Sequence, residues 1–161
     1  MFAKSYFNFI FSLVTVLITA GLCSYFNNIG MDNFYSDIKL AALNPPNYVF
    51  PIMWTILYVL LVIAFDLVLE NKEKSASAVA GSFIFNMFLQ VLWCYVFFGK
   101  GYFLIGFWVI LALILSTAFL LYQFYQRHKG AAYMIVPYFL WLLFAAYLNW
   151  AVYDLNGASV L

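Results

Sequence analysis

Amide and aromatic side chains recur at helical spacing in three strongly apolar segments. Asn86, Gln90 and Trp93 are four and three residues apart, so a helix would carry them on one face. Polar side chains at membrane depth are costly and by default suggest a site. Aromatic rings beside a few amides suit a flat, largely apolar ligand, which the rings stack on and the amides orient. The candidate ligand-binding residues are Phe50, Trp54, Tyr58, Asn86, Gln90, Trp93, Phe97, Tyr138, Trp141, Ala145 and Asn149.

The same stripes have a plainer interpretation as helix packing. Asn and Gln side chains form hydrogen bonds between membrane helices, and a chain with 23% aromatic residues produces aromatic stripes easily. Asp66 is the one acid clearly inside an apolar segment, as a proton-linked exporter would need, but it lies near enough to the segment's end to reach the interface. No catalytic constellation or phosphate-binding glycine loop is present, so whether the chain is an enzyme stays open.

The composition requires lipid as solvent for these segments. Hydrophobic residues make up 68% of the 161 residues and charged residues 8%, against roughly 25% charged in a soluble domain. Because a span takes about 20 residues, we predict an all-α, polytopic membrane protein with five transmembrane helices in a bundle, forming one domain over 1–161. The expected spans cover about 6–26, 49–69, 76–98, 102–125 and 131–153. The first could also be a signal peptide, but Leu22 before Cys23 makes a poor cleavage site.

The remaining polar residues exclude several classes of partner. Seven Lys or Arg residues, scattered among loops, form no patch for nucleic acid. Cys23 and Cys94 each lie inside an apolar run, and we interpret them as small apolar helix residues. His128 is the only histidine and lies in a charged loop, so no metal site is expected.

Basic residues predict the orientation, because short cytoplasmic loops are enriched in Lys and Arg. With five spans, one side of the membrane carries Lys4, Lys72, Lys74, Arg127 and Lys129, and the other carries Lys39 and Lys100. We therefore expect a cytoplasmic N-terminus and an external 27–47 loop. Ser77 and Gly81 form a small-xxx-small pair opposite Asn86, which would suit a homodimer or packing within the chain.

Three segments resemble signatures of the TspO/translocator-protein family, also called tryptophan-rich sensory proteins or peripheral benzodiazepine receptors. Segment 45–58 (PPNYVFPIMWTILY) resembles its Pro-Pro…Trp-Thr-x-Leu-Tyr signature. Segment 90–99 (QVLWCYVFFG) resembles its Asn-x-x-Trp-x-x-x-Phe-Phe-Gly pattern, with Gln90 in place of Asn. Segment 137–149 (PYFLWLLFAAYLN) resembles its Pro-Tyr-x-x-Trp-x-x-Phe-Ala-x-x-Leu-Asn pattern.

The resemblance implies five helices around a pocket that opens towards the first loop. It implies binding of a tetrapyrrole such as protoporphyrin IX or haem, or of synthetic isoquinolines and benzodiazepines, with no required cofactor, and a homodimer. Transport, sensing, and light- or oxygen-dependent porphyrin breakdown have all been proposed for the family. The sterol pattern attributed to some members needs a basic residue after its Tyr, whereas Asp154 and then no Lys or Arg follows Tyr153, so we do not expect sterol recognition.

Overall fold

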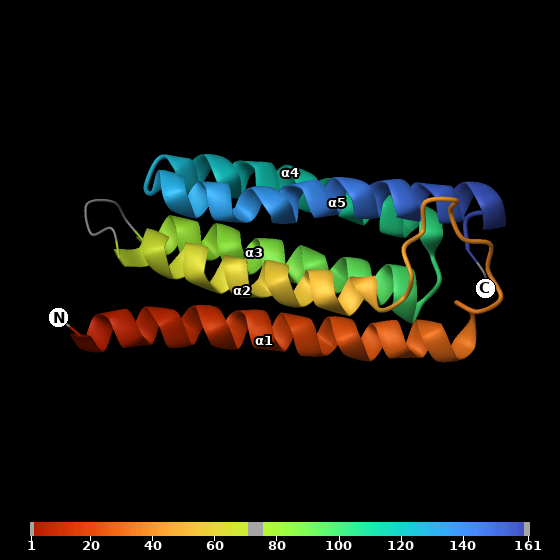
Figure 1. Cartoon of the computed structure of the whole chain (residues 1–161), viewed down its shortest axis with the longest axis horizontal. Coiled ribbons are helices and arrows are strands. Elements are labelled where there is room, and N and C mark those ends of the chain that lie inside the picture. The colour runs from red at the N-terminus through yellow and green to blue at the C-terminus, as the bar shows by residue number, and fades with distance from the viewer. Residues whose placement is uncertain (1, 71–75, 160–161) are drawn as a thin grey trace.

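The computed structural model describes residues 2–70 and 76–159, and this part of the chain is helical without strands (Figure 1). The helices are α1 (Phe2–Asn33), α2 (Val49–Glu70), α3 (Ala76–Cys94), α4 (Phe103–Tyr125) and α5 (Lys129–Asn156). All five are long and apolar enough to cross a membrane. The prediction of an all-α, five-span bundle is confirmed.

The helices lie side by side along one axis (Figure 1). Helices α4 and α5 form a tight pair, α3 packs on α4, and α2 packs on α5. Helix α1 contacts α2 and α3 on the side away from the α4–α5 pair. The first connection, residues 34–48, lies at the same end of the bundle as the C-terminal part of the chain.

Helix α1 is longer than the sequence predicted. The apolar run stops near residue 26, but the helix continues through a polar turn to Asn33. There it packs against the end of the third span, where a Cβ on Gly30 would lie 2.9 Å from the Phe98 backbone oxygen. A glycine at this position permits the close approach. The expected 27–47 loop is therefore shorter, and its first turns belong to the helix.

The other spans match the expected ranges to within a few residues. The third span ends in a single π-helical segment, η1 (Tyr95–Gly99), a local widening that is frequent at functional sites. Gly101, with φ 65°, then turns the chain into α4. Helix α5 begins two residues earlier than expected, because His128 Nδ1 accepts a hydrogen bond from the Ala131 backbone N–H at 3.0 Å and caps it.

At the end of the bundle near the α2–α3 connection, the interior is filled by phenylalanine rings. Phe65 and Phe83 stack at 4.0 Å between ring centroids, with 8° between their planes. Phe11 and Phe124 complete the cluster, each with its ring centroid 6.2 Å from that of Phe65. We call these four residues the phenylalanine cluster. It leaves the opposite half of the bundle to hold the site.

Candidate functional site

A cavity of about 700 Å³ occupies the bundle at the end near the first connection. Its wall is formed by α1, α2, α3, η1 and α5, and it extends to residues of the 34–48 connection. Ligand pockets in proteins span about 300–1,000 Å³, so its size suits a ligand of several fused or linked rings.

Most of the predicted site residues line this cavity. They are Phe50, Trp54, Tyr58, Gln90, Trp93, Phe97, Trp141, Ala145 and Asn149. Asn86 and Tyr138 do not line it. Both are fully buried between helices, on the side of the cavity towards the α2–α3 connection. The helix faces predicted from residue spacing therefore do turn towards the cavity. Asn86 and Tyr138 share those faces but lie beyond the inner end of the cavity.

Three tryptophans from three helices form the aromatic wall. The Trp54 ring lies 6.5 Å from Trp93 and 6.4 Å from Trp141 between centroids, and the Trp141 plane is turned by 89°. These separations are typical of favourable aromatic pairs. The Trp141 Nε1 atom is buried and has no hydrogen-bond partner in the described chain. A ligand with an acceptor atom at this wall would satisfy that donor.

Asn149 uses its amide to hold one of these rings. Its Oδ1 accepts a hydrogen bond from Trp93 Nε1 at 3.1 Å, and its Nδ2 donates to the Phe103 carbonyl at 2.8 Å. Gly106 makes room for this contact, because a Cβ there would lie 3.1 Å from the Asn149 oxygen. Asn149 is therefore a positioning residue that fixes the Trp93 indole at the cavity wall.

The second amide cluster lies below the cavity and serves packing. Tyr138 Oη is 3.1 Å from Asn86 Oδ1 and 3.3 Å from Gln90 Oε1, so its single proton is shared between these acceptors. Asn86 Nδ2 donates to Thr117 Oγ1 at 2.8 Å. This network joins α3, α4 and α5. The packing interpretation thus holds for Asn86 and Tyr138, and Gln90 joins the network to the cavity.

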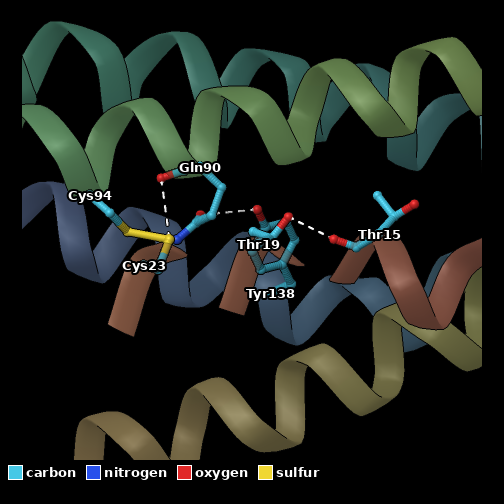
Figure 2. The surroundings of a disulfide bond; sticks show 6 residues. All are labelled: Thr15, Thr19, Cys23, Gln90, Cys94 and Tyr138. Atoms are coloured by element: carbon cyan, nitrogen blue, oxygen red, sulfur yellow. Dashed lines mark hydrogen bonds between the residues drawn. A yellow bond between two sulfur atoms is a disulfide. The ribbon is translucent and has the colours of Figure 1, made fainter. Parts of the chain in front are cut away.

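The expectation that Cys23 and Cys94 are separate apolar residues is wrong. The structure pairs them in a disulfide between α1 and α3 at the cavity wall (Figure 2). Their Cα atoms are 5.3 Å apart, a usual separation for a disulfide. The Cys23 sulfur also contacts the Gln90 carbonyl oxygen at 3.7 Å. Because 71 positions separate the two cysteines, only the packing of α1 beside α3 reveals the pair.

Helix α1 supplies a polar wall that the sequence analysis missed. Ser24, Asn27, Asn28 and Met31 line the cavity with Asn44 and Asn47 of the first connection. The α1 positions follow i, i+3, i+4, i+7 spacing, which marks one helical face. That signal was available, but the predicted end of the span near residue 26 placed these asparagines in a loop.

No Asp, Glu, His, Lys or Arg lines the cavity within the part of the chain that the structure describes. Tyr35 is at its mouth, and burial raises the pKa of its hydroxyl, which keeps the group neutral. Residues 2–70 and 76–159 also contain no group of three His, Cys, Asp or Glu residues that could hold a metal. Asp66 lies away from the cavity, next to the phenylalanine cluster, and its Oδ1 has no partner among the described residues.

Comparison with known proteins gives a consistent result. A model of the TspO/MBR family matches residues 11–154. The "Tryptophan-rich protein TspO" of Archaeoglobus fulgidus is 32% identical over 91% of this chain and 95% of its own. The "Tryptophan-rich sensory protein" of Cereibacter sphaeroides is 32% identical over 78% of each chain. The "Protein CrtK" of Rhodobacter capsulatus is 31% identical over 76% of this chain and 78% of its own.

Proposed function

Since the chain belongs to the TspO/MBR family, we propose that it is a membrane receptor or carrier for a flat tetrapyrrole such as protoporphyrin IX or haem. The ligand would lie in the cavity between α1, α2, α3 and α5. One observation carries the proposal: Trp54, Trp93 and Trp141 converge from three helices on one cavity. The name "tryptophan-rich sensory protein" of one relative fits a receptor role.

The walls fit a macrocycle better than they fit a metal. Indole and phenyl faces offer stacking surfaces, each contributing on the order of 0.5–1.5 kcal/mol beyond area burial. The unpaired Trp141 N–H offers one hydrogen bond to an acceptor on the ligand. The described lining holds no histidine, and its cysteines are joined to each other. Haem would therefore bind through its ring, without an imidazole or thiolate from this lining.

A titration followed by tryptophan fluorescence tests the proposal. Adding protoporphyrin IX to the detergent-solubilised protein should quench emission with a saturable curve, because the three indoles lie at the binding wall. Ala145→Leu should weaken binding, since Ala145 lines the cavity and a larger side chain fills it. Ala118→Leu is the matched control, because Ala118 is exposed on α4. Quenching that never saturates, or that is the same in Ala145→Leu, would contradict the proposal.

A second candidate function is light- and oxygen-dependent breakdown of the bound porphyrin. Trp54 and Trp141 favour it, because both indoles line the cavity and would lie against an excited macrocycle. Illumination of the protein with protoporphyrin IX in air should then consume the porphyrin faster than in the Trp54→Leu and Trp141→Leu variants. Equal rates in all three samples would leave receptor or carrier as the function.

The distribution of basic residues supports a proposal for how the cavity is oriented in the membrane. We propose that its mouth faces the outside and the N-terminus the cytoplasm; Lys72 and Lys74, part of this argument, lie outside the described residues. The disulfide in the cavity wall supports this, because disulfides persist in oxidising compartments. In intact cells, an impermeant maleimide should label Asn33→Cys and not Gln126→Cys. The reverse pattern would overturn the assignment.

We further propose a homodimer through α3. Gly81 is exposed, and a Cβ there would meet nothing within 4 Å, so packing within the described chain does not explain its small size. A second copy could approach closely at this position. Gly81→Leu should shift the protein towards monomer in cross-linking and sedimentation, whereas Gly21→Leu, equally open on α1, should not. Equal dimer content in both variants would refute the interface.

A further inference from the structure

The Cys23–Cys94 disulfide forms part of the wall of the cavity. Both cysteines line it, Cys23 from α1 and Cys94 from α3. Cys23 is half-buried, whereas Cys94 is only 3% exposed. Cys23 is thus the more accessible of the two cysteines to a reagent inside the cavity.

One residue, Gln90, contacts both sulfur atoms (Figure 2). Its backbone carbonyl oxygen lies 3.7 Å from Cys23 Sγ, and its amide Nε2 lies 3.9 Å from Cys94 Sγ. A disulfide has no S–H group to donate, but a Cys23 thiol could donate to that carbonyl. A Cys94 thiol or thiolate could accept from that amide. The surroundings therefore offer each sulfur a partner in the reduced form.

The cavity also provides a route by which a thiol can reach the bond. Exchange with a disulfide requires the attacking thiol as its charged thiolate, which is costly to bring through the hydrocarbon of a membrane. The cavity instead extends from the disulfide to its mouth at the first connection, where Asn28 and Asn47 are exposed. No Asp or Glu among the described residues lines this route to repel an anion.

We propose that the Cys23–Cys94 bond is a redox switch inside the cavity. Small dithiols that enter through the mouth reduce it, and a bound ligand blocks their access. In the reduced form α1 is no longer joined to α3, and the cavity binds its ligand more weakly. The reaction at the bond stands apart from the proposed function, whereas the part played by the ligand rests on it.

The reaction transfers two electrons from the dithiol to the protein. One thiolate of the dithiol attacks Cys23 Sγ and forms a mixed disulfide, while the electron pair of the broken bond leaves on Cys94 Sγ, where Gln90 Nε2 can donate a hydrogen bond. The second sulfur of the dithiol then attacks the first, closes a cyclic disulfide and releases Cys23 as a thiolate. The two protons that the dithiol gives up end on the two protein sulfurs.

Reduction by dithiothreitol of the intact protein in detergent tests the route. After an acid quench, denaturation with a maleimide-linked polymer adds two labels to each reduced chain, because the sequence has two cysteines. Asn27→Trp should slow reduction several-fold, since Asn27 lines the cavity one turn from Cys23 on the side of the mouth. Tyr25→Trp is the control, because Tyr25 is exposed on α1 outside the lining. Equal rates in the two variants would overturn the route.

The same assay in the dark tests whether the ligand blocks the reaction. At a free protoporphyrin IX concentration ten times its dissociation constant, about nine-tenths of the protein is occupied, so reduction should slow about tenfold. An unchanged rate while tryptophan quenching shows saturation would overturn the inference and leave the proposed function standing. If no saturable binding occurs, the proposed function fails and the role of the ligand fails with it, while Asn27→Trp still decides the route.

Reversibility separates a switch from a bond that only stabilises the fold. The protoporphyrin IX affinity of the wild-type protein should fall after reduction and return after reoxidation, and the Cys23→Ser/Cys94→Ser variant should not respond to either treatment. The factor by which reduction weakens binding should equal the factor by which saturating ligand opposes reduction at equilibrium, because the coupling between two sites is reciprocal. Equal affinity of the oxidised and reduced proteins, or an equal response of the double variant, would overturn the inference.

Discussion

The two ends of this bundle use aromatic side chains in opposite ways. At the end near the α2–α3 connection, Phe65 and Phe83 are fully buried and stack face to face. At the other end, Trp54 and Trp141 meet edge to face, with nearly perpendicular planes, in the wall of an open cavity. The same helices run through both ends. Abundant aromatic residues therefore do not make a pocket; something must also prevent the rings from collapsing together.

Polar and covalent contacts at the open end supply that constraint. The Trp93 indole is held to Asn149, and the disulfide fixes α1 to α3. In α1, the hydroxyls of Ser12, Thr15 and Thr19 donate to carbonyls of the same helix, as Thr19 does to the Thr15 carbonyl (Figure 2). Helix α1 therefore depends on the disulfide and on apolar packing to keep its place over the cavity.

The largest expected effect is at the filled end. Phe83→Ala should lower the free energy of unfolding in detergent by about 3 kcal/mol, because Phe83 is fully buried and its loss leaves a cavity in close-packed rings. The folded fraction should bind porphyrin with unchanged affinity, since the cluster lies outside the ligand cavity. Chemical unfolding and ligand titration of the same samples check both parts. A loss of affinity in fully folded protein would show that the two ends are not separate.

Removing the disulfide should have the next largest effect. The Cys23→Ser/Cys94→Ser double variant should lose roughly 2 kcal/mol of stability, at the low end of the usual range for disulfides, because the reference state in detergent keeps its helices. Its ligand affinity should also fall, since α1 forms one wall of the cavity. Wild-type protein under a dithiol reductant should behave in the same way. Unchanged stability in both samples would mean that apolar packing alone holds α1.

Asn149→Leu tests whether polar contacts hold the Trp93 ring in place at the open end. The substitution leaves the Trp93 N–H and the Phe103 carbonyl without their partner, at a cost of about 1–2 kcal/mol of stability. Ligand affinity should fall although Asn149 offers the ligand no free group. Near-ultraviolet circular dichroism should report the released indole. Full retention of that signal would contradict a positioning role.

The sequence predicted more of the fold than of the site's surroundings. Hydropathy located all five helices, but it ended the first too early, because the turn of Asn27 and Asn28 is held by contact with η1, which no local pattern reveals. Helical spacing gave the direction in which Trp93 and Trp141 point. Spacing could not give the position of each residue along the bundle, so Asn86 was included among the cavity residues. It also could not show which helices are neighbours, so the disulfide partner of Cys23 was missed.

Substitutions at two glycines of α1 should have the smallest effects on stability. The two positions form a matched pair, because one is crowded and the other is open. Gly30→Ala should destabilise the protein and push α1 away from η1, because its Cβ would lie 2.9 Å from the Phe98 carbonyl oxygen. Gly21→Ala has open space within 4 Å and should stabilise the helix by up to about 1 kcal/mol, the propensity difference between the two residues. Thermal unfolding of both variants checks the signs. The same sign for both would remove Gly30 as the point of close approach.

The most direct test of the central claim is a comparison of two tryptophans. Trp141 lines the cavity, whereas Trp108 is exposed on α4 away from it. Trp141→Leu should weaken protoporphyrin IX binding at least about tenfold, since losing about 1.4 kcal/mol of stacking and hydrogen bonding is a factor of ten. Trp108→Leu should leave the dissociation constant unchanged at equal helicity. Equal weakening by the two variants would contradict a ligand site at the open end of the bundle.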